Sequence, residues 1–189
     1  MGKRWLFRLT VITVLVAVGW WLVDREPLAP LPDEVVDEER RPDYFMEIFT
    51  MVSTDEGGDP VWELRSPRML HFPDDDSWEL DAPDLIYHMD SGEPWRLRAD
   101  EGRAWSGLEE ALLIGEVRMT REAGPDNVAA RMDTTDMRLY PPRRIAETDK
   151  YAIYETEGGV VEGVGARGHL ARDLVELHSE VKARYEMPR

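Results

Sequence analysis

Residues 43–189 contain short stretches in which apolar and polar side chains alternate, such as Trp62-Glu63-Leu64-Arg65, Trp95-Arg96-Leu97-Arg98 and Val117-Arg118-Met119. A period of two places the apolar side chains on one face of a β-strand. Turn sequences separate these stretches at short distances, at 56–60, 73–76, 90–94, 106–107, 124–126, 141–142 and 157–159. Many short strands at this spacing predict an all-β domain with two layers, a sandwich, roll or barrel.

The strand pattern repeats along the chain. Met69-Leu70-His71-Phe72-Pro73 corresponds to Met137-Arg138-Leu139-Tyr140-Pro141 at an offset of 68 residues, and Glu116-Val117-Arg118 corresponds to Glu180-Val181-Lys182 at an offset of 64. Each such unit contains two strand–turn–strand halves, and one half cannot bury its own apolar face, but stacked halves can. The sequence therefore predicts a roll built from two similar groups of strands.

The N-terminal part has a different pattern. Lys3, Arg4 and Arg8 accompany an apolar run, and residues 5–23 would form about 28 Å of helix, close to the ~30 Å hydrocarbon thickness of a bilayer. The basic residues predict that the N-terminus, residues 1–8, is cytoplasmic and that the chain after Val23 lies outside. A cleaved signal peptide is the alternative, but Trp20 and Trp21 stand where small residues would precede cleavage.

Residues 24–42 contain four Pro, seven acidic residues and three Arg, without an apolar period. This composition predicts an extended acidic tether between a single membrane helix at 5–23 and a domain at 43–189.

Alternation also predicts which side chains of the outer domain face inward, either as a filled core or as the lining of a groove for alkyl chains. The groove candidates are Trp62, Leu64, Met69, Trp95, Leu97, Leu113, Val117, Met119, Met137, Leu139, Leu170 and Val181. Tyr185 shares this inward register, and Trp78, Leu80, Leu85 and Tyr87 are further candidates. Periodicity alone favours a filled core, whereas the many Met and Trp side chains adapt well to irregular apolar ligands.

Composition and motifs exclude several functions. The 189 residues include 39 acidic and 23 basic side chains, a formal charge of −16, which disfavours nucleic-acid binding. There is no Cys, no nucleotide-binding P-loop and no Gly-x-Ser-x-Gly motif. The His residues lack zinc-site spacing, and Asp74-Asp75-Asp76 lacks the alternating spacing of a calcium loop. We therefore expect no metal, no cofactor, no serine-hydrolase chemistry and no ATP use by the chain itself, whereas paired acids for glycoside hydrolysis stay open.

Several ordered segments resemble the LptC family of lipopolysaccharide export proteins. Pro42-Asp43-Tyr44-Phe45-Met46 resembles the entry segment of that family, and Pro94-Trp95-Arg96-Leu97-Arg98-Ala99-Asp100 and Gly115-Glu116-Val117 resemble its central motifs. Arg167-Gly168-His169-Leu170 and the segment from Val181 to Tyr185-Glu186 are similar to its C-terminal motif. The acidity and the long Pro-rich tether depart from the family pattern.

The resemblance implies an open β-jellyroll-like fold in the periplasm, behind an inner-membrane anchor. It implies that the protein binds the acyl chains of lipopolysaccharide, receives it from an inner-membrane ABC transporter and passes it to a periplasmic bridge protein of similar fold. It implies no catalysis. It further implies partner contacts at the two ends of the roll, near Tyr44 and Phe45 at one end and near Gly168 and Tyr185 at the other.

Two other functions remain open from the sequence. One is a membrane-tethered β scaffold with a solid core, which binds partners only through its strand edges. The other is a tethered glycan-processing enzyme, which would need two converging carboxylates in a cleft.

Overall fold

The structure, a computed structural model, describes residues 40–89, 91–105, 108–172 and 174–185. Within these residues the predicted all-β fold is confirmed, apart from short 3₁₀ turns. The predicted membrane helix at 5–23, the cytoplasmic segment 1–8 and residues 24–39 of the predicted tether lie outside the described residues. Across the described segments, no helix is long and apolar enough to cross a membrane.

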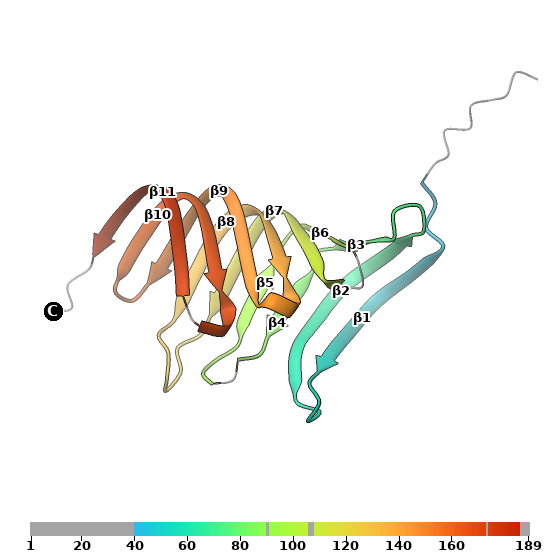
Figure 1. The fold of residues 1–189 in the computed structure, drawn as a ribbon, viewed down its shortest axis with the longest axis horizontal. Helices are drawn as coiled ribbons and strands as arrows, with labels where there is room; N and C mark the ends of the chain where they lie inside the picture. The colour runs from blue at the N-terminus through green and yellow to red at the C-terminus, as the bar shows by residue number, and fades with distance from the viewer. Residues whose placement is uncertain (1–39, 90, 106–107, 173, 186–189) are drawn as a thin grey trace, which may run out of the picture. The chain divides into compact units, whose positions relative to one another are not determined.

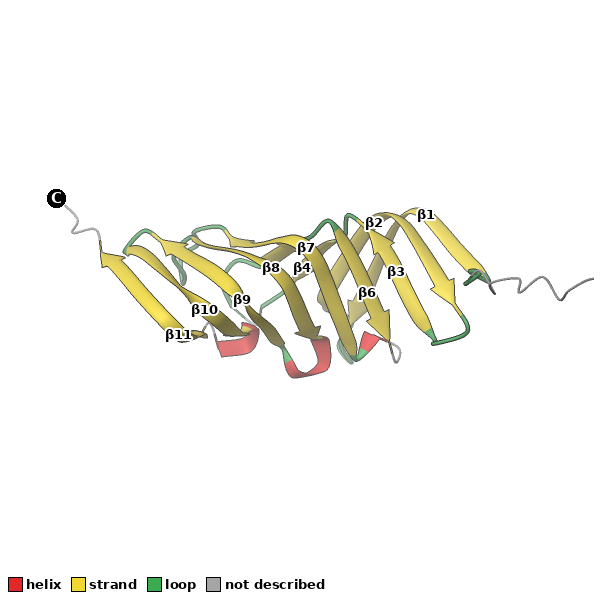
Figure 2. Cartoon of the chain, turned by 90° about the horizontal axis from the view of Figure 1, so that it is seen from above, coloured by secondary structure: helices red, strands yellow, loops and turns green. Residues whose placement is uncertain are grey.

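Eleven described strands follow one another along the chain (Figure 1). Their bounds are β1 Tyr44–Thr54, β2 Pro60–Phe72, β3 Ser77–Asp81, β4 Asp84–Tyr87, β5 Trp95–Arg98, β6 Glu101–Trp105, β7 Glu110–Arg121, β8 Ala130–Tyr140, β9 Ile145–Thr156, β10 Gly159–His169 and β11 Leu174–Tyr185. Two 3₁₀ turns, η2 (Pro141–Arg143) and η3 (Leu170–Arg172), connect β8 to β9 and β10 to β11. All pairings are antiparallel, and Figure 2 shows the strands side by side from β1 to β11.

The sheet is folded into two layers. Along one side, the same strands continue from one layer into the other and so close that side. β2 pairs with β4 through residues 62–65 and with β3 through residues 68–72. β7 likewise pairs with β6 through residues 110–114 and with β5 through residues 118–120. We call the layer that contains β4 and β5 the first layer and the layer that contains β3 and β6 the second layer. Long strands such as β2 and β7 bend from one layer into the other.

The bends form a line, which we call the crease. β3 and β4 are one strand interrupted at Ala82-Pro83, and they pair with β6 and β5 in a single register, from Ser77 opposite Trp105 to Tyr87 opposite Trp95. Elsewhere the chain bends at a positive φ, at Gly115 in β7, Asp136 in β8 and Gly165 in β10, among others. At φ values of this sign the backbone leaves the regular pleat, so a long strand can turn from one layer into the other.

Side chains at the crease bond the backbone groups that the bends leave out of the ladder. The Gly115 amide donates to Asp136 Oδ1 (3.1 Å) and the Glu116 amide donates to Asp100 Oδ2 (2.8 Å). The Thr134 hydroxyl donates to the Tyr151 carbonyl (2.9 Å), and the Thr148 hydroxyl donates to the Thr135 carbonyl (3.1 Å). These bonds lower the cost of the bends, because buried backbone groups without a partner are unfavourable.

The predicted repeat corresponds to equivalent strands. Met69 to Phe72 end β2, and Met137 to Tyr140 end β8, and in both cases the following proline begins a turn. Glu116-Val117-Arg118 lies just past the bend of β7, and Glu180-Val181-Lys182 lies at the bend of β11. The first group of strands is therefore β2 to β7, and the second group is β8 to β11.

Candidate functional site: an apolar groove between the layers

The inward faces of the two layers form one apolar groove that follows the strand order. β2 to β6 contribute Leu64, Met69, Leu80, Tyr87, Trp95, Leu97 and Ala104, and β7 to η3 contribute Leu113, Val117, Met119, Ala130, Met132, Met137, Leu139, Ala146, Ala152, Ala166 and Leu170. Trp62 and Leu85 pack against both groups of buried residues. The groove is lined by apolar side chains because each strand alternates inward apolar with outward polar residues.

The outward face carries the charges of the same strands. Arg96 and Arg98 of β5 pair with Asp84 of β4, and Arg118 and Arg131 pair with Asp133 of β8. The hydrogen bond from Arg96 lowers the pKa of the Asp84 carboxyl below its ordinary value. Acidic and basic groups thus stay in the solvated outer surface, where they neutralise one another without entering the groove.

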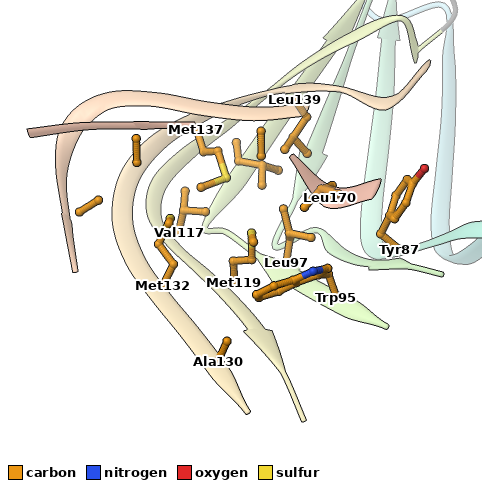
Figure 3. Packing of buried hydrophobic residues seen from close by; sticks show 14 residues of the cluster. Tyr87, Trp95, Leu97, Val117, Met119, Ala130, Met132, Met137, Leu139 and Leu170 are labelled. Atoms are coloured by element: carbon orange, nitrogen blue, oxygen red, sulfur yellow. The ribbon is translucent and has the colours of Figure 1, made fainter. Parts of the chain in front are cut away.

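In the middle of the groove, methionine side chains point into the space between the two layers (Figure 3). Met119 and Met132 lie opposite one another in the first layer, and Met137 comes from the second layer. Each is at most 2% exposed. We call Met119, Met132 and Met137 the methionine cluster.

Opposite Met119, the second layer presents a small residue, Gly168 of β10. A Cβ added to Gly168 of β10 would lie 3.9 Å from the terminal methyl of Met119 and 3.8 Å from the Ala146 carbonyl. Ala146, Ala152 and Ala166 of β9 and β10 are also buried in this part of the core. The side chains of the methionine cluster, rather than the facing wall, therefore fill the space between the layers here.

A small cavity lies between the layers, bordered by residues from β2 to η3. Its volume is about 60 Å³, and its lining includes Trp62, Leu64, Leu85, Leu113 and Leu139. A cavity of ~150 Å³ is what a benzene-sized guest occupies. An acyl chain therefore needs the groove to rearrange before it can enter.

Side chains of both layers meet at the side opposite the crease. The Arg144 guanidinium lies over the Tyr87 ring, 5.9 Å from its centroid, so a second-layer turn reaches a first-layer strand. The backbone amide of buried Leu170 donates to the Arg144 carbonyl (2.9 Å), which fixes η3 against the same turn. In the first layer, the Arg121 guanidinium lies over Trp95, 4.7 Å from the ring centroid. Cation–π contacts therefore cover part of the opening between the layers.

The two outermost described strands each pair on one side. β1 pairs with β2, and β11 pairs with β10. Both carry exposed apolar side chains: Tyr44 and Phe45 of β1 are 52% and 66% exposed, and Tyr185 of β11 is 79% exposed. An edge of this kind offers backbone donors and acceptors to a further strand.

The entry into β1 is fixed to the second layer by polar contacts. His71 Nδ1 lies 2.6 Å from Asp43 Oδ1, and His71 Nε2 lies 3.2 Å from Asp76 Oδ1. The hydrogen bond with Asp43, reinforced by Asp76, raises the pKa of His71. The Trp78 ring packs on His71 with a centroid distance of 4.4 Å, so the start of β1, the end of β2 and β3 are joined at one point.

Arg40 forms a second contact, just ahead of β1. Its guanidinium binds Asp74, Asp75 and Glu79 and lies 3.9 Å from the centroid of the Phe72 ring. These acidic residues thus surround an arginine. Among the described residues no group of three or more His, Asp or Glu side chains is arranged to hold a metal ion.

Most sequence-derived groove residues lie together between the layers, and the differences are local. Val181 lies on β11 and is half exposed. Gly168 is not on the end strand: it is paired with Ala146 on one side and with Val175 on the other, and it faces the methionine cluster. Met132 is a central groove residue that the alternation analysis missed.

Comparisons with known proteins agree with this architecture. The family model described as "LptC: Lipopolysaccharide-assembly, LptC-related" matches residues 9–186. A comparison with the sequences of curated proteins found no match.

A solved structure resembles the fold of this chain. It is LptH from Pseudomonas aeruginosa, described as the LptA homologous periplasmic component of the conserved lipopolysaccharide transport device. The TM-score is 0.54 at 9% sequence identity, over 67% of this chain and 95% of the LptH chain. At this identity the likeness concerns the fold.

Proposed function

Because the chain belongs to the LptC family of lipopolysaccharide-assembly proteins, we propose that it carries lipopolysaccharide through its apolar groove as a non-enzymatic transfer component. It would receive the lipid from an inner-membrane ABC transporter and pass it to a periplasmic bridge protein of similar fold. The N-terminal segment would anchor the chain in the inner membrane by one helix, with residues 43–189 in the periplasm. The likeness to the LptH fold supports a periplasmic partner that can continue the same sheet.

The observation that carries this proposal is the continuous apolar face between two unpaired edges. Each methylene of an acyl chain left in water costs ~0.8 kcal/mol, so a lipid with several chains needs a dry path. Groove residues from β2 to β10 supply such a face, while the charged side chains of the same strands point outward. No cofactor or metal is needed for this role.

The edges suggest how the path continues into the partners. A strand of a neighbouring roll can add to β1 or to β11 through main-chain hydrogen bonds, with the exposed apolar side chains as additional contacts. Tyr44 and Phe45 would then face the transporter side, and Tyr185 would face the bridge protein. The groove of one protein would continue into the next without exposing acyl chains.

The filled centre of the groove favours a second candidate function. With an interior cavity of about 60 Å³, the domain could serve as a tethered scaffold that joins partners by its edges and carries no lipid. The two functions differ in whether lipopolysaccharide reaches the inward side chains.

Site-specific photo-crosslinking separates them. A photoreactive residue at Leu97 or Met119, both buried in the groove, should form adducts with lipopolysaccharide. The matched outward positions Arg96 and Arg118, one residue away on the same strands, should not. Equal labelling at inward and outward positions, or labelling at neither, would exclude transfer through the groove, and intact partner pairing without labelling would support the scaffold.

A further inference from the structure

The methionine cluster divides the groove into two parts. On its N-terminal side the walls are large side chains such as Trp62, Leu85 and Tyr87, with the small cavity among them. On its C-terminal side the walls of β9 and β10 are small, with Ala152 and Ala166 buried. A chain that travels from the β1 end to the β11 end must pass between these two parts.

Buried side chains occupy the space between them. Met119 and Met132 are paired across β7 and β8, and Met119 reaches Gly168 on the opposite layer. Val117, two residues before Met119 on β7, is also buried. The layers therefore contact one another through side chains rather than through a fixed backbone barrier.

These side chains are of the type that is easiest to move. Methionine is unbranched, has three rotatable side-chain bonds and packs in irregular spaces. Because the residues opposite are small, the conformation of the methionine side chains decides whether the passage is open. A β-branched side chain of similar volume would be stiff at χ1 and could not vacate the passage as readily.

We propose that Met119, Met132 and Met137 act as a displaceable plug, which closes the groove in the absence of lipid and moves aside for acyl chains. This inference rests on the proposed function. It assigns to the three methionines control of passage between the two halves of the groove. In the empty protein they keep the interior dry, and during transfer acyl methylenes replace the contacts between methionines and small residues.

The test uses the full chain in detergent micelles with purified lipopolysaccharide as the probe. A photoreactive residue is placed at Leu85, on the N-terminal side of the plug, or at Val175, which packs against the core from β11 on the C-terminal side. Each is combined with the triple substitution Met119→Ile, Met132→Ile and Met137→Ile. Because isoleucine conserves volume and favours strands, this variant should fold, which circular dichroism checks.

We expect adducts at both positions in the unaltered chain. In the triple variant the amount of Val175 adduct should fall about tenfold, while the amount of Leu85 adduct stays the same. A tenfold fall corresponds to ~1.4 kcal/mol of additional free energy for passage of the acyl chain. Met119→Ala alone should raise the Val175 adduct. Met51→Ile, which alters a partly buried methionine of the edge strand β1, should leave the ratio of the two adducts unchanged.

The outcomes separate the plug from the function on which it rests. If the amount of Val175 adduct is the same in the triple variant and in the unaltered chain, the proposal of a plug is wrong, while the proposal of transfer through the groove is unaffected. If neither position is labelled in the unaltered chain, the proposed function fails and the plug fails with it. If Met51→Ile lowers the Val175 adduct as much as the triple variant does, control by the methionine cluster is refuted.

Discussion

Met119 of β7 and Gly168 of β10 face one another across the groove, and a Cβ added to Gly168 would stand 3.9 Å from the Met119 methyl. This is ordinary contact distance, so the position has room for one methyl group. Gly168→Ala should therefore change the free energy of unfolding by at most about 1 kcal/mol. Gly168→Leu should lower it by about 1–3 kcal/mol, because the larger side chain has to displace Met119.

Urea denaturation of the full chain in a mild detergent measures both effects. The family resemblance implies a partner contact near Gly168, at the end of the roll. Its buried position now predicts that Gly168→Arg destabilises the domain more than Gly168→Leu, because a charge enters an apolar space. A Gly168→Arg variant as stable as the unaltered chain would contradict this placement.

The crease depends on Gly115, which has a φ of +82° and lies against the Asp100 side chain. Gly115→Ala should reduce the free energy of unfolding by about 1–3 kcal/mol. The alanine would have to adopt the left-handed backbone conformation, and its Cβ would displace the Asp100 carboxylate, which accepts a hydrogen bond from the Glu116 amide. Asp100→Ala should cost about 1 kcal/mol through loss of that hydrogen bond.

Thermal unfolding followed by circular dichroism compares these variants. Gly158→Ala is the matched control, because the nearest atom to its added Cβ is Thr156 Oγ1 at 3.7 Å and its φ is not left-handed. A Gly115→Ala variant that unfolds like Gly158→Ala would show that the bend does not need glycine.

Ile48 in the edge strand β1 has a φ of +48° and is 91% exposed. A β-branched residue is unfavourable in this conformation, whereas asparagine adopts it readily. Ile48→Asn should therefore raise the midpoint of thermal unfolding, because it increases the free energy of unfolding by about 1 kcal/mol. Val52→Asn, on the same strand without a positive φ, should give no gain. If Ile48→Asn also weakens capture of a partner by the β1 edge, the unfavourable isoleucine is retained for that contact.

His71 predicts a pH dependence at the start of β1. Its pKa is raised in the folded protein by Asp43 and then by Asp76, so the protonated form is favoured by folding. The stabilisation is fully present below the unfolded value of about 6.5 and is lost as the pH rises through the higher folded pKa. The stability difference between the unaltered chain and His71→Gln should therefore be larger near pH 6 than near pH 9.

Urea unfolding at the two pH values provides the measurement. His178→Gln, on β11, controls for general effects of removing a histidine. A difference that grows toward high pH would show that neutral, rather than protonated, His71 joins Asp43 to Asp76.

Arg40 should hold the chain ahead of β1 in place through Asp75 and Glu79. Arg40→Gln should speed chymotrypsin cleavage at Tyr44 or Phe45, which are exposed, and the effect should shrink at high salt. Arg41→Gln, which alters the neighbouring exposed arginine, should leave the cleavage rate unchanged. Equal rates for the two variants would mean that the Arg40 ion pairs do not restrain β1.

Local alternation was enough to predict much of the groove, and it fails where a strand bends. Trp95 and Leu97 face inward and Arg96 and Arg98 outward, as their alternation predicts, because β5 is short and lies within one layer. In β8 the same rule fails. Met137 and Leu139 are inward, and counting back by two would point Met132 outward, yet the bend at Asp136 shifts the register and buries Met132.

The position of a strand in the sheet is a second kind of information that alternation lacks. Gly168 lies near the C-terminus of the chain but one strand inside the edge, and only the pairing of β10 with both neighbours shows this. The contact between Met119 and Gly168 joins residues far apart in the sequence, so no local pattern contains it.

Chain reversals, such as those at 124–127 and 157–158, border the side of the groove opposite the crease. A reversal can be lengthened at a small entropic cost, because closing a longer loop adds only about 0.6 kcal/mol for each doubling of its length. Inserted residues there would extend the lips of the groove while leaving every strand ladder intact. The borders of the opening, rather than its floor, are therefore where proteins of this architecture have the greatest freedom to diverge and where reporter groups can be introduced.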